Sequence, residues 1–443
     1  MTHVRDHDAL DRPTIMRRLF YAIALSLLFV LLYGASNYYA STLTDHYVLR
    51  YSWEMHIPML PGFIIPYMSI DLFFFFSFFL CTTNTELRTH AVRLAVCTIV
   101  AACCFVIFPM KLGMDRPHLT GVNGEIYAFL KSFDYPHNLC PSLHVAYTLI
   151  LRMLYSRHTR GLIWWLFHVW FFAVSFSVLF VHQHHVIDLL GGAALATVVM
   201  YFVPSRDRRL ALPPRGAGNP NHRVAGWMIF GAIACAASIA IDPWFLWPLV
   251  WPAFMFVMLA AAYMSVGPRV FRKFNGRLPL NVLAIFGPYL VGLWLSRKWF
   301  NRKATPWPVV DDNLWSGRVL TIAEARLLID AGCVAVLDLT AEHSASAPMR
   351  SVHYLNIPIL DLTAPDTNQC DVAIDFIDRH IQTGPVFIQC GLGRSRGATI
   401  IAHYLLHSGR VRNENEAIDM LRAARPNITI SQNVVIRSVD ELP

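Results

Sequence analysis

Residues Pro385–Thr399 decide the fold of the C-terminal part of the chain, and they read Pro-Val-Phe-Ile-Gln-Cys-Gly-Leu-Gly-Arg-Ser-Arg-Gly-Ala-Thr. The apolar run from Val386 to Ile388 predicts a buried strand, and Ala398–Leu406 predicts a helix. The loop between them starts at Cys390 and contains two glycines. This order forms an anion site, because backbone N–H groups converge on the loop and the helix dipole favours negative charge.

The side chains of this loop indicate phosphate chemistry. The positive field of the loop stabilises Cys390 as a thiolate, which is the nucleophilic form of cysteine. Arg396, six residues later, can bind two phosphate oxygens at once through its planar guanidinium. We expect the intervening residues to bind the substrate, namely Gly391, Leu392, Gly393, Arg394 and Ser395.

The Cys-x5-Arg loop resembles that of cysteine-dependent phosphatases, specifically the dual-specificity branch, and its Gly-Arg-Ser-Arg ending resembles members that act on phospholipids. The resemblance implies that an aspartate on a preceding loop protonates the leaving oxygen. Asp361, 29 residues before the cysteine, is the preferred candidate and Asp366 is the rival. The sequence departs from the family at Gln389, where histidine is usual, and at Gly397, where serine or threonine is usual. The first departure weakens thiolate stabilisation, and the second removes a hydroxyl that helps the thiolate leave.

Composition divides the chain of 443 residues into two unlike parts. It is 55% hydrophobic, with a formal net charge of +8. Residues 311–443 carry 11 arginines, no lysine and 16 acidic residues, whereas residues 1–310 carry 26 basic and 13 acidic ones. A basic, apolar first part and an acidic last part predict a membrane domain followed by a soluble one. The basic charge therefore indicates membrane orientation and no nucleic-acid partner.

Apolar runs predict the membrane spans. The candidates are roughly 19–36, 62–81, 91–109, 142–156, 163–182, 185–203, 224–241 and 244–266. With a cytoplasmic N-terminus, the basic stretches between them all fall inside, as the positive-inside rule requires. The loops after the third and fifth spans then share the outer face.

The apolar stretch 278–296 breaks this pattern. A crossing there would place the soluble domain outside, yet Gly287-Pro288 interrupts the stretch and basic residues follow it. We therefore interpret it as a re-entrant or interfacial segment. A cytoplasmic C-terminal domain also suits a catalytic thiolate, which needs a reducing compartment.

The predicted fold is an α-helical polytopic membrane domain, with a six-span core and two or three further apolar segments, followed by a small α/β cysteine-phosphatase domain. After residue 311 we expect strands at 334–339 and 354–359, a helix at 372–380, the Cys390 strand and loop, and helices at 398–408 and 414–424. The expected boundaries are a disordered N-terminus at 1–16, a membrane core at 17–204, a basic linker at 205–223, additional segments at 224–304 and the phosphatase domain at 305–443.

A second set of polar motifs lies beside the predicted spans, where ionisable residues are usually functional. Lys111, Arg116 and Ser142 are candidates to bind the phosphorylated substrate, and His144 can protonate a leaving oxygen. The remaining pair is His184 and Asp188, whose i,i+4 spacing lets the carboxylate orient the imidazole as a nucleophile.

These motifs resemble the type-2 phosphatidic acid phosphatase superfamily over about residues 17–204. The resemblance implies that His184 forms a phosphohistidine, Asp188 assists it and His144 is the acid. Two features depart from the family. Four residues separate Lys111 from Arg116 where six are usual, and Val178 stands where the third motif has an arginine. The pattern is nearer to inositol phosphorylceramide and sphingomyelin synthases, so hydrolysis and transfer to an alcohol both remain open.

The whole chain resembles bacterial fusions of these two domains, which implies an inner-membrane protein. We expect a membrane phosphatase with a histidine site and a cysteine site, acting on phospholipids or their precursors among membrane lipids, with no metal and no cofactor. Two alternatives remain. One is a membrane-anchored phosphoprotein phosphatase whose first domain senses lipid. The other is an inactive scaffold.

Overall fold

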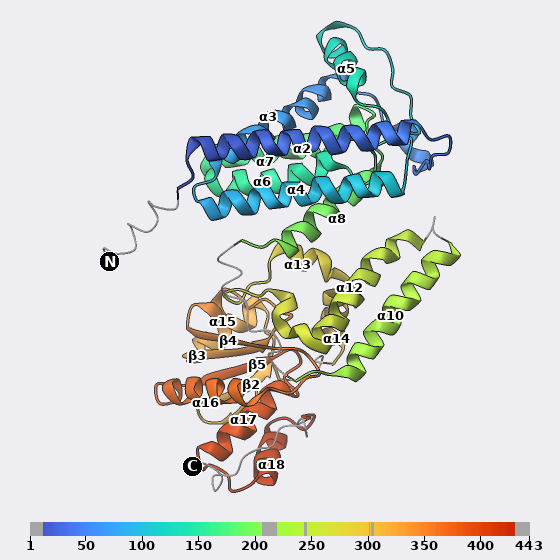
Figure 1. The fold of residues 1–443 in the computed structure, drawn as a ribbon. Coiled ribbons are helices and arrows are strands. Elements are labelled where there is room, and N and C mark those ends of the chain that lie inside the picture. The colour runs from blue at the N-terminus through green and yellow to red at the C-terminus, as the bar shows by residue number, and fades with distance from the viewer. Residues whose placement is uncertain (1–11, 206–218, 243–245, 301, 303–304, 430–443) are drawn as a thin grey trace. The chain divides into compact units, whose positions relative to one another are not determined.

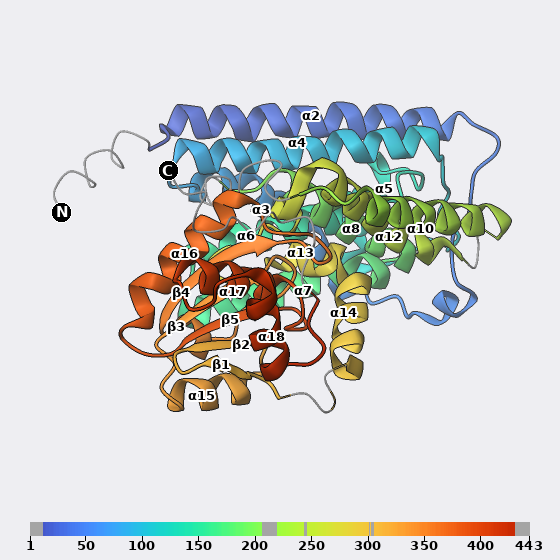
Figure 2. The same cartoon turned by 90° about the horizontal axis from the view of Figure 1, so that it is seen from below.

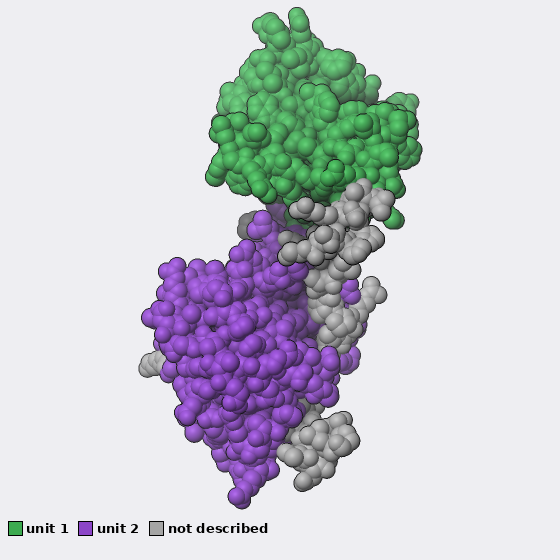
Figure 3. Space-filling model, turned by 90° about the vertical axis from the view of Figure 1, so that its left-hand side faces the viewer, with its two compact units in different colours: residues 1–209 green, residues 210–443 purple. Residues whose placement is uncertain are grey.

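The computed structural model describes residues 12–205, 219–242, 246–300, 302 and 305–429. The chain divides into two compact units, Met1–Arg209 and Leu210–Pro443 (Figure 3). Most of the predicted disordered N-terminus and most of the predicted basic linker lie outside the described residues.

The first unit is a helical bundle. Its elements are α2 (Ile15–Ser41), η1 (Ser52–His56), η2 (Pro61–Phe63), α3 (Ile64–Leu80), α4 (Asn84–Ile107), α5 (Gly121–Phe133), α6 (Leu143–His158), α7 (Gly161–Phe180) and α8 (Val186–Phe202) (Figure 1). Several helices begin at residues that favour N-caps, since the side chains of Thr14, Thr83 and Ser142 accept backbone N–H groups of the first turn. Helix α5 was not predicted from the sequence.

The length and apolarity of its helices are those of a multi-pass membrane protein. Among the described residues, six helices are long and apolar enough to cross a membrane: Ile15–Ser41, Pro61–Leu80, Asn84–Ile107, Gly161–Phe180, His222–Ile241 and Trp247–Phe271. Two predicted spans, at 142–156 and 185–203, form the shorter helices α6 and α8. The outward side of α2 keeps large apolar side chains exposed, including Phe20, Leu27 and Leu31, as expected of a surface that contacts lipid.

The second unit begins with apolar helices. They are α10 (His222–Ile241), η3 (Trp247–Leu249), α12 (Val250–Ala261), the π-helical turn η4 (Ala262–Val266), η5 (Gly267–Phe271), α13 (Leu280–Ile285) and α14 (Gly287–Phe300). Helices α10 and α12 run side by side (Figures 1 and 2).

The predicted interfacial stretch 278–296 forms two helices, α13 and α14, that meet at Phe286. Pro288 explains the break, because proline has no backbone N–H to continue a helix. Helix α14 has exposed apolar side chains, among them Trp294 and Trp299, and basic residues in its last turn. This composition is typical of a helix at a membrane interface, and its placement there stays a prediction.

The rest of the second unit is a five-stranded sheet with helices on both faces (Figure 2). The strands are β1 (Val309–Asp311), β2 (Leu314–Arg318), β3 (Ala335–Thr340), β4 (His353–Ile359) and β5 (Val386–Cys390), in the order β1-β2-β5-β3-β4. Only β1 is antiparallel to its neighbour. The helices are α15 (Ile322–Asp330), α16 (Thr367–Ile381), α17 (Arg396–His407) and α18 (Glu414–Ala424), with the turn η6 (Pro348–Arg350).

Two apolar cores hold this sheet. One face packs against α16, α17 and α18 through residues such as Leu337, Ile377 and Ile401. The other face packs against α15 through Val336, Phe387 and Leu328. The sheet thereby fixes its four parallel strands so that their carboxyl ends lie at one edge, which is where open α/β sheets bind ligands.

The strands and helices predicted after residue 311 are present in the structure. Three further elements of this domain were not predicted. The sequence did not indicate β1, β2 or α15. Strand β1 has three residues and β2 contains Ser316-Gly317, so neither shows an apolar run. A signal for α15 did exist, since Thr321 and Glu324 form a capping box at its start.

Candidate active sites

Cys390 ends β5, at the centre of the sheet edge. It pairs in register with Arg318 at the end of the neighbouring strand β2 and is buried. The loop that follows turns at Gly393, whose φ of 68° favours glycine. A Cβ at Gly393 would lie 2.7 Å from the backbone of Gly317, so the loop packs tightly against the end of β2.

Arg396 is held in place by carboxylates before any substrate binds. Its guanidinium is buried, donates to both carboxylate oxygens of Glu342 at 3.1 and 2.8 Å, and donates to the Ile359 carbonyl at 2.7 Å. Burial acts to raise the pKa of Glu342, but the attraction of Arg396 and the hydrogen bonds to this carboxylate together outweigh burial, and the pKa is lowered. Burial lowers the pKa of the adjacent His343 to about 4, so that imidazole is neutral and Arg396 is the cation that pairs with Glu342.

Asp361 lies beside the same guanidinium. Its Oδ1 accepts a hydrogen bond from Arg396 Nη2 at 3.1 Å. Burial raises the pKa of this carboxyl, and the attraction of Arg396 offsets only part of the effect. The rival Asp366 is the N-cap of α16 and accepts from the Gln369 backbone N–H at 2.8 Å. Asp361 is therefore the aspartate that contacts Arg396.

The other loop residues have separate surroundings. The Leu392 carbonyl accepts from Arg425 at 2.9 Å, Gly391 accepts from the Val319 backbone, and Ser395 precedes α17. A cavity of about 290 Å³ beside the loop is lined by Phe300, Thr305, Pro308, Arg394, Ala424, Arg425, Pro426 and Asn427. Its two arginines add positive charge next to the loop.

The two departures from the phosphatase pattern have visible consequences. Gln389 is fully buried, and its amide nitrogen and oxygen have no hydrogen-bond partner among the described residues. A Cβ at Gly397 would lie 3.8 Å from Cys390 Sγ, which is an ordinary contact. Position 397 therefore has room for a side chain that faces the thiol.

The histidine candidates of the first unit meet where α6 and α8 begin. His184 Nδ1 lies 3.4 Å from Asp188 Oδ2. The prediction that both residues share a helix face is wrong in one respect, because His184 precedes α8, whose N-cap is His185. Asp188 accepts from the His185 backbone N–H at 2.8 Å as part of a capping box, and this bond fixes the carboxylate beside His184.

His185 is committed to structure, which leaves His184 as the candidate nucleophile. His185 Nε2 accepts from the Gly113 backbone N–H at 3.1 Å, so its Nδ1 carries the proton donated to Glu54 at 2.9 Å. The bond from Gly113 also brings the loop that starts at Lys111 next to the start of α8.

His144 and Ser142 lie at the start of α6. The Ser142 backbone donates to the Asp188 carbonyl at 3.0 Å and its hydroxyl caps α6, so it ties the two helix starts together. The His144 ring stacks on Tyr67 with 4.2 Å between centroids, within electrostatic range of His184. His144 Nε2 is buried and has no hydrogen-bond partner among the described residues, as suits a group that awaits a ligand.

The two basic candidates differ. Arg116 is mostly buried, donates to the Asp134 carbonyl at 2.6 Å and pairs with its carboxylate at 3.8 Å. Asp134 also accepts from Tyr33 at 2.8 Å. Lys111 is exposed, and its described hydrogen bond is from its backbone to Tyr47.

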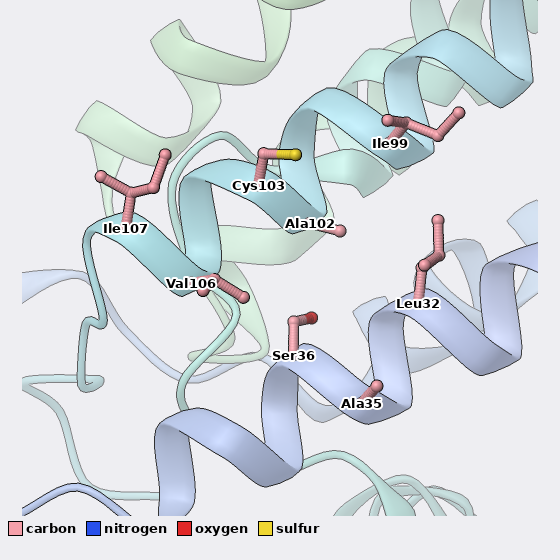
Figure 4. A pocket seen from close by; sticks show the side chains of 8 residues that line it. All are labelled: Leu32, Ala35, Ser36, Ile99, Ala102, Cys103, Val106 and Ile107. Carbon is pink, nitrogen blue, oxygen red and sulfur yellow. The ribbon is translucent and has the colours of Figure 1, made fainter.

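Two further observations concern ligands. A cavity of about 400 Å³ between α2 and α4 has an almost wholly apolar lining and contains none of the candidate residues (Figure 4). Within the described residues, no group of three or more histidine, cysteine or acidic side chains has an arrangement that could hold a metal ion.

Comparison with known families assigns both regions. Residues 318–437 match the sequence model of the dual specificity phosphatase catalytic domain, and residues 72–210 match that of the PAP2 superfamily. The chain carries both domains. Both are phosphatase domains, so the chain is a phosphatase that acts on phosphorylated substrates. No curated protein matches the chain.

Several solved structures are similar to part of the chain. The crystal structure of Tk-PTP in the active form is 23% identical, with 29% of this chain and 90% of that chain covered and a TM-score of 0.27. The crystal structure of PTPMT1 is 22% identical, covering 28% and 87%, with a TM-score of 0.26. The crystal structure of human DUSP28 is 20% identical, covering 29% and 86%, with a TM-score of 0.26.

Sequence reasoning missed the acidic partners of both sites. Glu342, which holds Arg396, lies two residues after the end of β3, and this position near a strand end was the available signal. Glu54, which fixes His185, lies about 130 residues away in sequence with no motif around it. Long-range pairs of this kind carry no local pattern.

Proposed function

We propose that this protein is a two-site membrane phosphatase, in which the dual specificity domain uses Cys390 and the PAP2 domain uses His184, and that both act on phospholipids or their precursors. The observation that carries the proposal is the arrangement around Arg396. Cys390, Arg396 and Asp361 meet at one sheet edge, in the same compact unit as two long apolar helices. A phosphatase domain built together with membrane helices works where lipid head groups are.

At the cysteine site, the Cys390 thiolate attacks phosphorus and a Sγ–P bond forms as the P–O bond of the leaving group breaks. Asp361 gives its proton to the leaving oxygen, which its raised pKa favours. Arg396 and the loop N–H groups neutralise the charge on the transferred phosphoryl group. Water then attacks phosphorus, Asp361 takes a proton from it, and the Sγ–P bond breaks to release phosphate.

At the histidine site, Asp188 holds the Nδ1 side of His184 so that Nε2 attacks phosphorus. His144 gives a proton to the leaving oxygen. The phosphohistidine then passes its phosphoryl group to water or to an alcohol. Val178, at the position of the usual arginine, is fully buried and apolar, so this site has one fewer cation to hold a phosphate monoester. That loss favours an alcohol as a competing acceptor.

The proposed location is a bacterial inner membrane, with the dual specificity domain on the cytoplasmic side. Basic side chains at the end of α14, Arg297 and Lys298, support the orientation, because positive charge flanks the cytoplasmic ends of apolar segments. Free thiols support the same side. Cys390 and the other eight cysteines are all unpaired.

The test is a phosphate-release screen of phospholipids and phosphopeptides with the full chain, Cys390→Ser, His184→Ala and the double variant. We expect each single variant to lose one part of the lipid activity and the double variant to lose all of it. With a radiolabelled lipid phosphate, Cys390→Ser should retain acid-labile, base-stable label typical of phosphohistidine, and the double variant should retain none. Activity on phosphopeptides alone would exclude the lipid assignment, and label in the double variant would exclude His184.

A further inference from the structure

Residues 219–300 belong to neither family match, which cover 72–210 and 318–437. In the second unit, this segment contacts two loops of the cysteine site. One is loop 341–345, which carries Glu342. The other is loop 360–363, which carries Asp361. The segment therefore contacts both of the loops whose carboxylates bond to Arg396.

The first contact is made by the turn 272–278, which we call the strap. It is closed by a bridge between Phe274 and Arg277. The Gly276 carbonyl accepts from the Ala345 backbone N–H at 2.7 Å, and the Leu278 backbone N–H donates to Ser344 Oγ at 3.0 Å. These bonds fix the loop that immediately follows Glu342.

A buried ion pair anchors the strap to the sheet. Lys273 Nζ lies 2.6 Å from Asp338 Oδ2 and donates to the Thr340 carbonyl at 2.8 Å. Both charged side chains are almost fully buried. Gly276 allows the strap to lie this close, because its φ is 70° and a Cβ there would lie 2.7 Å from the Tyr354 hydroxyl.

The second contact is made by Asn221, just before α10. Its Nδ2 donates to the Leu362 carbonyl at 2.8 Å, and Leu362 directly follows Asp361. Leu362 has a φ of 59°, a conformation that costs free energy in a residue with a side chain and must be held by its surroundings. Asn221 supplies one such restraint.

The helices behind Asn221 complete this side of the site. The Asn221 backbone N–H donates to the Tyr263 carbonyl at 3.0 Å. The hydroxyls of Tyr263 and Tyr289 pair with one another and lie within electrostatic range of Asp361 and Glu342. The loop of Asp361 is thus backed by residues from α10, η4 and α14.

We propose that Asn221 and the strap are positioning elements of the cysteine site. They join the apolar helices to the loops that carry Asp361 and Glu342, and so orient the Asp361 carboxyl toward the leaving oxygen. This role rests on the activity proposed for Cys390. Asn221 touches no reacting atom and acts through the Leu362 carbonyl. Its contribution appears at the step in which the Asp361 proton moves to the leaving oxygen as the P–O bond breaks.

The test uses the full chain with His184→Ala, so that the remaining phosphate release comes from the cysteine site. Asn221 also caps α10 by accepting from the Val224 N–H at 3.1 Å. Asn221→Asp keeps this cap, because aspartate caps helices as well as asparagine does, and it replaces the N–H donor to Leu362 with a charged carboxylate oxygen. The matched control is Asn281→Asp, which adds the same charge in the same segment, where among the described residues the side chain accepts one hydrogen bond, from the adjacent Val282 N–H.

Two substrates separate positioning from general damage. An alkyl phosphate needs its leaving oxygen protonated, whereas an aryl phosphate with an acidic phenol does not. We expect Asn221→Asp to slow the alkyl phosphate by about 10- to 100-fold, to leave the aryl phosphate within about twofold, and to flatten the fall in alkyl rate at high pH. Asn281→Asp should match the parent on both substrates.

Three other outcomes would overturn the proposal. Equal rates for Asn221→Asp and Asn281→Asp on the alkyl phosphate would show that the bond to Leu362 has no part in catalysis. Equal losses on both substrates would show that it only supports the fold. If the parent releases no phosphate that Cys390→Ser abolishes, the function proposed for the cysteine site fails first, and the positioning role fails with it.

Discussion

Two catalytic candidates at the cysteine site, Arg396 and Asp361, are restrained by neighbours that take no part in the reaction. Glu342 orients Arg396 through two hydrogen bonds, and Asn221 holds the loop of Asp361. A bound phosphate would compete with Asp361 for Arg396 Nη2, which would free the carboxyl to turn to the leaving oxygen. Glu342 therefore pairs with the charge of Arg396 independently of a substrate.

The raised pKa of Asp361 predicts the pH dependence of the cysteine site. Burial keeps this carboxyl protonated to higher pH than usual, while Arg396 and Glu342 face it with opposite charges. The rate should fall as pH rises through its pKa, because the acid is lost. In a His184→Ala background, Asp361→Asn should slow alkyl phosphate hydrolysis by about 100- to 10,000-fold and abolish that fall. A rate profile with the same high-pH limb in the variant would assign the acid to another group.

Gly397 predicts a gain of function. A serine side chain there would reach Cys390 Sγ without collision, since a Cβ would lie 3.8 Å away. Its hydroxyl should stabilise the departing thiolate by a hydrogen bond and speed breakdown of the phosphocysteine by about tenfold. Turnover of an aryl phosphate after the initial burst measures this step. Gly397→Ala is the control, because it adds the Cβ alone, and an equal effect of both variants would refute the hydroxyl's role.

At the scale of elements, the cysteine site lies at the carboxyl edge of the sheet, and the strap bonds to the loop that follows β3. Lys273 of the strap is the only cationic partner of Asp338 among the described residues. Burial acts to raise the pKa of Asp338, but Lys273 and the hydrogen bonds from Tyr354 and Thr340 together outweigh burial, and the pKa is lowered. The strap is thus part of the core of the soluble domain although it follows directly from a membrane helix.

Removing the strap's charge should destabilise the soluble domain. Lys273→Met leaves Asp338 buried and uncompensated, which costs about 3–5 kcal/mol. The temperature at which the full chain loses cysteine-site activity should fall, with His184→Ala as the background. Lys298→Met is the control, because Lys298 is exposed over the Trp294 ring and contributes about 1 kcal/mol or less. Equal inactivation temperatures for the two variants would contradict a structural role for Lys273.

The sequence predicted those elements whose pattern is local. The Cys390 strand, loop and helix follow one another within 22 residues, and α18 agrees with its predicted bounds of 414–424. The strap was not predicted, because its partners Asp338 and Ala345 lie about 65 residues away and nothing in Lys273-Phe274-Asn275-Gly276 marks them. The i,i+4 spacing of His184 and Asp188 gave the right contact for a wrong reason, since a capping box places them and not a continuous helix.

At the scale of the whole molecule, the charge asymmetry and the apolar helices bear on orientation. Residues 1–310 carry the basic excess and residues 311–443 the acidic one. If the soluble domain is cytoplasmic, a fluorescent reporter fused after Pro443 should be bright and an alkaline phosphatase reporter at the same place should be inactive. Strong alkaline phosphatase activity would mean that 278–296 crosses the membrane. A reporter fused in the loop between α4 and α5 should give the opposite result and serves as the control.

The buried pair of Lys273 and Asp338 also has a consequence for biosynthesis. The lysine leaves the ribosome 65 residues ahead of its partner, an interval of about 3 to 13 seconds at usual rates of translation. During that interval α10 and α12 are already available to enter the bilayer, whereas β3 has not been made. The sheet must then assemble onto a lysine that is already tethered to the membrane surface. The apolar helices of the second unit are therefore synthesised before the sheet that forms its core.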